Sequence, residues 1–235
     1  MLRIEGLRKN FGGLKALDGL DFEVPPRSIL GVLGMNGSGK TTMLNCINGV
    51  YIASSGSIQL DGKELTGLKP AQIFDRGVGR TFQVPRVFSR MTLWDNLAVP
   101  LLSRSMTRAE RDEIRATWLK KVHLFDLRHN YAEELSGGQQ KLLELARIMV
   151  SRPKLVLLDE PFAGVNPTLS RLLIDVIRDM PGETGCSVVL VSHDLTSIYE
   201  LSHDIIVMHE GRILARGDAE TVQSNPDVVE AYLGA

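Results

Sequence analysis

The chain has 235 residues, enough for one large domain or for a core domain with a smaller lobe. Its net charge is only −1, with both signs scattered along the sequence, which provides no electrostatic footprint for nucleic acid. No apolar run approaches the roughly 18 residues that a membrane-spanning helix needs, and Met1–Glu5 does not fit a signal peptide. We therefore expect a cytoplasmic chain that acts at a membrane only through partners.

The N-terminal third is predicted to be rich in strands. A Phe11-Gly12-Gly13 turn separates the first two strand candidates, and Asp61-Gly62 is a hairpin-type turn signal after a later one. Lys69-Pro70 opens a short helix, because proline is favoured at the first helical position. The expected strands are 2–7, 20–24, 28–33 and 57–60, and the expected helices are 42–48 and about 70–75.

A glycine-rich segment joins the strand at 28–33 to the helix that follows it. Gly34–Thr41 fits G-x-x-x-x-G-K-[ST], the phosphate-binding loop of P-loop nucleotidases. Its glycines let several backbone N–H groups turn toward one anion, while Lys40 supplies a positive charge and Thr41 a hydroxyl for Mg²⁺. The helix start adds its positive end. The residues predicted to hold the nucleotide here are Gly34, Asn36, Gly37, Ser38, Gly39, Lys40, Thr41 and Thr42.

From Thr92 to Asn130 strand signals vanish, charges are dense and apolar residues recur at helical spacing. Thr107–Glu110 is a capping box that opens one helix. We expect a helical subdomain over about 84–140, inserted into a core made of 1–83 and 141–235.

Helices and strands alternate in the last third of the chain, which is typical of an α/β fold with a mostly parallel sheet. Asn166-Pro167 is an N-cap followed by proline and predicts a helix to about Met180. Asn225-Pro226 opens a last short helix. The remaining expected elements are a helix over 139–150 and strands over 155–158, 187–191, 205–208 and 212–215.

The strand at 155–158 is apolar on both faces and ends in Asp159-Glu160. The carboxyl ends of strands in α/β sheets are where ligands bind, so Asp159 is a candidate Mg²⁺ ligand. Glu160 is a candidate for directing the water that attacks the terminal phosphate. Taken alone, the two acids could also form an ordinary solvated strand edge.

A third segment, Leu135–Gln140, places a serine and two glycines at a helix start. Such a segment can bind an anion, or it can be merely a loop with an N-cap. Gly34–Thr41, Leu135–Gln140 and Leu155–Glu160, in this order, resemble the ATP-binding cassette of ABC transporters over essentially the whole chain. The resemblance implies a P-loop NTPase core, an antiparallel N-terminal β subdomain and an inserted helical subdomain.

Several further residues match positions that have roles in this family. Phe11 matches an aromatic that stacks on adenine, although it could be a core residue at a strand end. Gln83 matches the glutamine that contacts Mg²⁺ and water, and His193 matches the histidine that contacts the γ-phosphate. Asn166 stands in a loop that reaches the second subunit, where many families have Asp. In the family the signature segment caps a nucleotide held by a second cassette, and here it comprises Ser136, Gly137, Gly138 and Gln139.

The resemblance implies an ATP hydrolase that uses ATP and Mg²⁺, pairs head to tail with a second ABC ATPase subunit and lies on the inner face of the cell membrane against integral permease subunits. Gly79–Phe88 and Glu230–Gly234 resemble the branched-chain amino acid importer type, which also involves a periplasmic solute-binding protein. The stretch between Gln83 and Ser136 is, however, shorter than in many such subunits.

Other functions remain open from the sequence. Glu160–Val165 also resembles the ATPases of lipopolysaccharide export. A soluble P-loop enzyme such as a kinase would not need Leu135–Gln140. A non-transport ABC ATPase of repair or translation usually carries coiled-coil insertions, zinc cysteines or a second cassette, none of which this sequence shows.

Overall fold

The computed structural model describes residues 1–102 and 104–233, so Gly234 of the C-terminal motif lies outside the described residues. An antiparallel sheet comes first, with strand order β2-β1-β4-β5, which confirms the predicted N-terminal β subdomain. Its first two strands are longer than expected and meet directly at the Phe11–Leu14 turn. The strands are β1 (Leu2–Phe11), β2 (Leu14–Val24), β4 (Ser55–Leu60) and β5 (Lys63–Glu64).

The second sheet has the order β10-β9-β3-β8-β7-β6. All of its neighbouring pairs are parallel except β9 and β10, which confirms the expectation of a mostly parallel sheet. The strands are β3 (Ile29–Gly34), β6 (Val78–Arg80), β7 (Leu155–Asp159), β8 (Ser187–Val191), β9 (Asp204–His209) and β10 (Arg212–Gly217).

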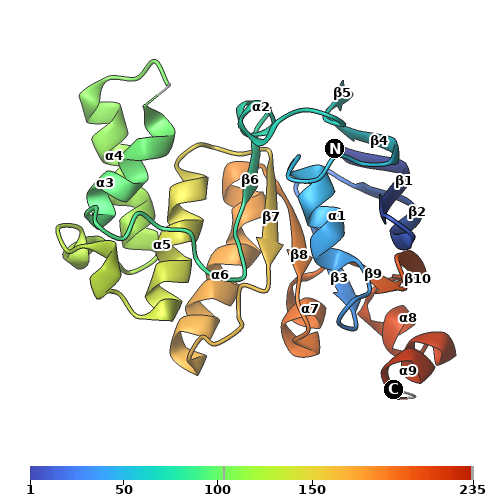
Figure 1. Ribbon diagram of the computed structural model, residues 1–235. Coiled ribbons are helices and arrows are strands. Elements are labelled where there is room, and N and C mark those ends of the chain that lie inside the picture. The colour runs from blue at the N-terminus through green and yellow to red at the C-terminus, as the bar shows by residue number, and fades with distance from the viewer. Residues whose placement is uncertain (103, 234–235) are drawn as a thin grey trace.

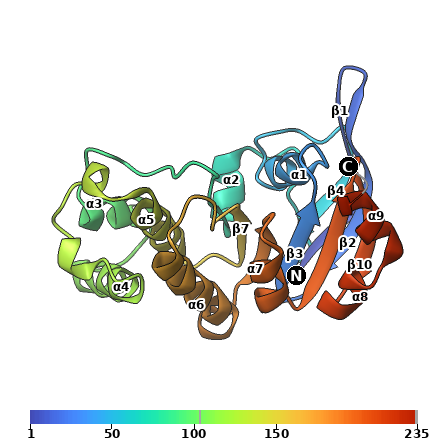
Figure 2. The same ribbon diagram turned by 90° about the horizontal axis from the view of Figure 1, so that it is seen from below.

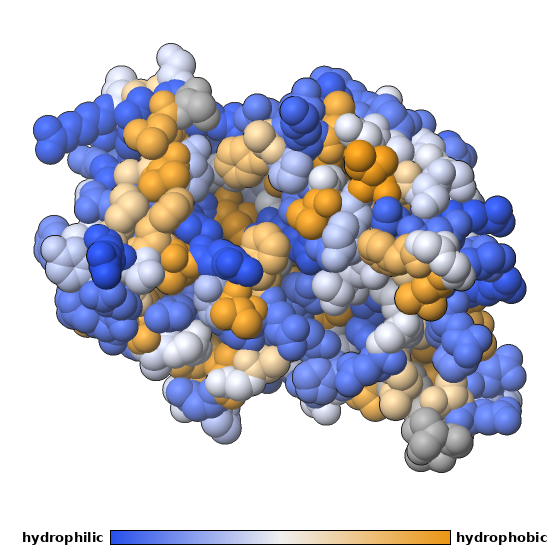
Figure 3. Space-filling view, in the orientation of Figure 1, coloured by the Kyte–Doolittle hydropathy of each residue, from blue (hydrophilic) through white to orange (hydrophobic). Residues whose placement is uncertain are grey.

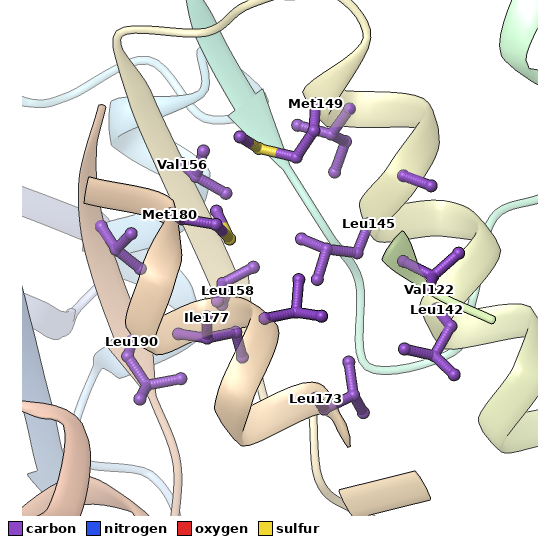
Figure 4. Close-up of a cluster of buried hydrophobic side chains, with 14 of the residues drawn as sticks. Val122, Leu142, Leu145, Met149, Val156, Leu158, Leu173, Ile177, Met180 and Leu190 are labelled. Carbon is purple, nitrogen blue, oxygen red and sulfur yellow. The ribbon is translucent and has the colours of Figure 1, made fainter. Parts of the chain in front are cut away.

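Both faces of this sheet are buried, since successive side chains of a strand point to opposite faces. On β7, Leu155 and Leu157 belong to one apolar cluster, and Val156 and Leu158 belong to another. The first cluster joins α1 (Lys40–Ile47) and the antiparallel sheet. The second joins α5 (Gly137–Met149), α6 (Pro167–Thr184) and α7 (Leu195–Leu201), and Figure 4 shows its side chains interdigitating between α5, α6 and the strands.

The predicted helical part contains α3 (Leu93–Ala98) and α4 (Arg108–Lys121), and the expected capping box at Thr107 and Glu110 is formed. In both ribbon views these helices lie at one end of the molecule, and the antiparallel sheet lies at the other (Figures 1 and 2). Helix α5 starts beside them and continues across residues 140 and 141, so one rigid element bridges the boundary we expect between helical subdomain and core.

Several elements differ from the sequence-based expectation. Strand β6 is only three residues long and includes a glycine and a buried arginine, so no apolar pattern marks it. Helix α6 runs through Pro181 to Thr184 and ends at Gly185, whose φ of 75° is typical of a left-handed C-cap. Helix α7 is short and mixes polar with apolar residues, so its sequence shows no clear helical pattern. The remaining helices are α2 (Pro70–Asp75), α8 (Ala219–Gln223), α9 (Pro226–Leu233) and the 3₁₀ turns Val99–Leu101, Phe125–Leu127 and Ala132–Glu134.

Candidate functional site

The glycine-rich loop links β3 to α1, which is the arrangement the motif predicts. Gly39 precedes the helix at a φ of 105°, and a Cβ there would lie 2.7 Å from the carbonyl oxygen of Ala16. At Gly34 a Cβ would lie 2.4 Å from the carbonyl oxygen of Met208. Neither position can hold a side chain without moving neighbouring backbone, so both glycines are needed for this loop path.

Lys40 is buried and lies inside the loop. Its Nζ donates to the carbonyl oxygens of Gly34 at 2.7 Å and Met35 at 3.0 Å. Burial lowers the pKa of this ammonium group, while the nearby carboxylates of Glu160 and Asp159 oppose that shift. The buried Ser38 Oγ has no hydrogen-bond partner within the described residues. A cation bonded to the carbonyl oxygens of a glycine-rich loop, beside an unsatisfied hydroxyl, fits an anionic ligand.

This loop opens onto a cleft of about 1090 Å³. The cleft brings together residues that are far apart in the sequence, from β1, α1, the segment after β6 and the end of β7. The sequence-predicted residues that line it are Phe11, Asn36, Gly37, Gly39, Lys40, Thr41, Thr42, Gln83 and Glu160.

Phe11 lies at the mouth of the cleft and is 41% exposed, so the interpretation of Phe11 as a core residue is wrong. Its ring meets Tyr51 edge-on, with centroids 5.2 Å apart, and Lys9 Nζ lies 4.8 Å from its centroid. The ring is thus held in place with exposed surface remaining, as stacking on a planar base requires.

Asp159 ends β7 and is almost fully buried. Its Oδ2 accepts from Arg80 Nη2 at 3.1 Å, and Arg80 Nη1 donates to Asn45 Oδ1 at 2.6 Å. The side chains of Arg80 and Asp159 are only 3% and 5% exposed, which makes this a buried ion pair. Desolvation lowers the pKa of Arg80, and the Asp159 carboxylate counteracts it. No sequence signal pointed to Arg80, because its strand is too short to show which way it faces.

Glu160 follows in a left-handed conformation, with a φ of 51°. This backbone is unfavourable for a residue with a side chain, and it turns Glu160 toward the cleft. Its Oε2 lies 2.7 Å from His193 Nδ1 and accepts from the His193 backbone N–H at 3.2 Å. His193 itself is exposed and does not line the cleft, so the structure brings it to Glu160 rather than to the phosphate loop.

Thr41 and Gln83 provide a hydroxyl and an amide oxygen at the cleft wall, whereas Asp159, next to the lining residue Glu160, is buried and does not itself line the cleft. Oxygen donors of this kind suit Mg²⁺, which keeps several of its waters and takes few protein ligands. The residues present therefore fit the ion by their chemistry, although the Asp159 carboxylate is bonded to Arg80 in this structure.

The signature segment lies elsewhere. Ser136 is the N-cap of α5, and its backbone N–H donates to Gln139 Oε1 at 2.9 Å, forming a capping box. None of Ser136, Gly137, Gly138 or Gln139 lines the cleft among the described residues. The structure thus does not unite the two predicted anion-binding segments within one chain. Asn166 is the N-cap of α6, and its side chain accepts from the N–H of Leu169 at 3.0 Å.

Sequence reasoning missed one wall of the cleft, formed by β2 and the β9–β10 hairpin. His209, which no motif surrounds, lines it, as does Arg212, which pairs with Asp18 at 2.6 Å. Only the tertiary structure reveals this wall, because β10 of the second sheet packs against β2 of the antiparallel sheet, far away in the sequence. The additional lining residues are Leu14, Lys15, Ala16, Asp18, His209, Glu210, Arg212, Ile213 and Leu214.

Comparison with known proteins decides the family. Residues 17–163 match the family model described as ABC transporter. This chain belongs to the ABC transporter family. The cassette is therefore an ATP-binding chain of the ABC ATPase type, and its last residues, 212–235, match a second model, described as branched-chain amino acid ATP-binding cassette transporter.

Relatives of the cassette extend over its full length. It is 38% identical to BraF of Pseudomonas aeruginosa and 37% identical to LivG of Escherichia coli K12, both named as high-affinity branched-chain amino acid transport ATP-binding proteins. Each alignment covers 100% of this chain and 98% of the relative. A solved ATP-binding cassette in its ADP conformation superposes with a TM-score of 0.88 at 32% identity, covering 100% of this chain and 99% of that one.

Across the described residues, the cassette contains no helix that is long and apolar enough to cross a membrane. The face shown in Figure 3 is mostly hydrophilic, and its apolar patches are separated from one another by polar side chains.

Proposed function

We propose that this cassette is the ATP-hydrolysing subunit of an importer of branched-chain amino acids or related small solutes, bound to the cytoplasmic face of the cell membrane. The observation that carries the proposal is the match of residues 212–235 to the model for this transporter type. The similarity to BraF and LivG supports it, because each alignment covers 100% of this chain and 98% of the relative.

In the proposed reaction, Lys40 and the loop amides bind the β- and γ-phosphates of ATP, and Phe11 stacks on the adenine. Thr41, Gln83 and Asp159 would hold Mg²⁺, which would neutralise charge on the phosphate oxygens. Glu160 orients the attacking water and accepts its proton. His193 lies 2.7 Å from Glu160 and holds that carboxylate in position until the γ-phosphate is present.

We further propose that two cassettes face each other head to tail. The cleft of one chain contains a phosphate loop but no signature segment, and Ser136–Gln139 remain at a separate helix start. A nucleotide in one cleft would therefore be completed by Ser136, Gly137 and Gly138 of a second cassette. Because the γ-phosphate bridges two positive ends, ATP favours the closed pair and ADP does not.

The permease is proposed to dock beside Gln83. Phe88 is 43% exposed and Val84 is 70% exposed, so both can contact a helix of a membrane subunit. Val87 instead packs against the core of the cassette. Replacing Phe88 with Glu should prevent assembly with the permease. If assembly is unchanged, this surface is not the docking site.

Two alternatives predict different partners. An exporter of lipopolysaccharide or another lipid would pair with permeases but need no solute-binding protein. A soluble P-loop ATPase would hydrolyse ATP as a single chain, with no role for Ser136. Vesicles that contain the complete transporter and a solute-binding protein decide between them, because uptake of leucine, isoleucine or valine must require both ATP and the binding protein.

The variant Glu160→Gln tests the chemistry. It should lower kcat by roughly 10²–10⁴-fold, the usual contribution of a general base, while ATP affinity stays unchanged. It should also trap the closed pair, which size-exclusion chromatography with ATP would detect. Glu133→Gln, an exposed acid outside the cleft, is the matched control and should hydrolyse ATP at the wild-type rate. Wild-type turnover by Glu160→Gln would remove Glu160 from the mechanism.

A further inference from the structure

Helix α5 carries two buried charges of opposite sign, one helical turn apart. Lys141 is 8% exposed and Glu144 is 1% exposed. Neither forms an ion pair with another side chain in the part of the chain that the structure describes; both are bonded to backbone groups of two loops at the nucleotide site. The helix begins with the signature segment, so these charges lie one and two turns behind Ser136–Gln139.

Glu144 holds the loop that contains Gln83. Its Oε1 accepts from the backbone N–H of Arg86 at 2.7 Å, and its Oε2 accepts from the N–H of Phe82 at 3.3 Å. The carbonyl oxygen of Arg86 in turn accepts from Arg147 Nη2, one turn further along α5. Both sides of the Gln83 loop are thus tied to the same helix.

Lys141 holds the loop that contains Glu160. Its Nζ donates to the carbonyl oxygen of Glu160 at 2.9 Å and to that of Ala163 at 2.7 Å. Glu160 has a left-handed backbone, with a φ of 51°, which persists only when its surroundings fix it. The two bonds from Lys141 supply that restraint at the residue whose side chain reaches the cleft.

The sign of each charge suits the backbone groups that it contacts: the carboxylate of Glu144 meets N–H groups, and the ammonium of Lys141 meets carbonyl oxygens. Burial raises the pKa of Glu144, and the N–H groups of Arg86 and Phe82 oppose that rise. Burial lowers the pKa of Lys141, and its attraction to Glu144 and Glu160 opposes that change. Buried charges without such partners are strongly unfavourable, so both loops are confined to positions that satisfy them.

From these contacts we infer that Lys141 and Glu144 are positioning residues that lock the signature helix to the Gln83 loop and to the Glu160 loop of the same chain. The inference rests on the proposed roles of Gln83 and Glu160. When a partner's nucleotide moves Ser136–Gln139, α5 moves both loops with it. The chain thereby positions its own Glu160 carboxylate and its own Gln83 in response to the nucleotide bound in the partner's cleft.

The decisive variant exchanges the two charges, Lys141→Glu with Glu144→Lys. It keeps one positive and one negative group in the same buried space, but each then faces backbone groups of the wrong polarity. We expect kcat to fall by roughly 10²-fold, the usual consequence of a small displacement of a reacting group. ADP affinity should stay near the wild-type value, because the phosphate loop is untouched. If the two residues serve only as a charge pair, the exchange will leave kcat unchanged and overturn the inference.

Single substitutions test the same contacts if the variant with exchanged charges does not fold. Lys141→Gln retains an N–H donor for the carbonyl of Glu160, and Lys141→Met does not, so the glutamine variant should keep several-fold more of the wild-type kcat. Glu144→Leu should speed hydrogen exchange at the amides of Phe82 and Arg86 in the nucleotide-free chain, and Lys141→Met should not. Equal kcat for the two Lys141 variants, or unchanged exchange in Glu144→Leu, would contradict the inference.

The exposed Lys63→Met is the matched control, and it should behave like the wild type. If the proposed function itself is wrong, the result differs from a failure of this inference. The wild-type chain with Mg²⁺ would then not hydrolyse ATP, or Glu160→Gln would hydrolyse it at the wild-type rate. Hydrogen exchange at Phe82 and Arg86 is independent of hydrolysis, so it tests the contacts of Glu144 in either case.

Discussion

Replacing Arg80 with methionine should destabilise the fold strongly. The substitution keeps an apolar stem of similar length but removes the guanidinium that pairs with Asp159 Oδ2 at 3.1 Å and donates to Asn45 at 2.6 Å. Both members of the pair are at least 95% buried, so the Asp159 carboxylate would be left without its partner in the interior. Breaking a buried pair in this way typically costs about 3–5 kcal/mol.

The structure favours the lower end of that range. The ammonium group of Lys40 interacts favourably with Asp159 and would compensate part of the lost attraction. We therefore expect Arg80→Met to lower the free energy of unfolding by about 3 kcal/mol in urea titrations. Adding Asp159→Asn removes the unpaired charge and should restore about 1.5 kcal/mol or more of that loss, which a double-mutant cycle measures.

An exposed ion pair provides the control. Lys154 and Asp61 lie 2.7 Å apart, with side chains 59% and 41% exposed, so Lys154→Met should cost about 1 kcal/mol or less. A loss of under 1 kcal/mol for Arg80→Met, or a double variant no more stable than Arg80→Met alone, would refute the argument that Arg80 balances a buried carboxylate.

Three further outcomes are expected. Lys40→Ala should weaken ADP binding by about 1.5–3 kcal/mol in calorimetric titrations, because it removes a charge-assisted contact. Burial raises the pKa of Glu64, but hydrogen bonds from Thr66, Ser57 and the Ile58 backbone outweigh it and hold the value at about 2. Its deprotonated form is thus favoured on folding, so the stability advantage over Glu64→Gln in urea titrations should be complete above pH 4.5 and disappear as the pH falls toward 2. Gly182→Ala should raise the free energy of urea unfolding by about 0.5–1 kcal/mol, since a Cβ in this helix would meet nothing within 4 Å.

Local patterns in the sequence predicted the elements whose ends carry strong signals. The capping box at Thr107 and the Asn166-Pro167 start both formed as expected, because these side chains bond to backbone within their own turn. Strand β6 was missed for the opposite reason. Three residues with a glycine at the centre have no periodicity, and only pairing with β7 makes them a strand.

By itself, the sequence determined the phosphate loop and most of the strands and helices, because each depends on residues that are adjacent or a few turns apart. The resemblance to the family followed from three such local motifs in their order along the chain. Only the tertiary structure decided that Phe11, Gln83, Glu160 and the unforeseen His209 share one cleft while Ser136–Gln139 do not. It also decided that Arg80 faces Asp159 and that Glu144 faces the Gln83 loop. These contacts join segments far apart in the chain. Their partners are selected by how the sheets and helices pack and by the burial of charge, which no local pattern records.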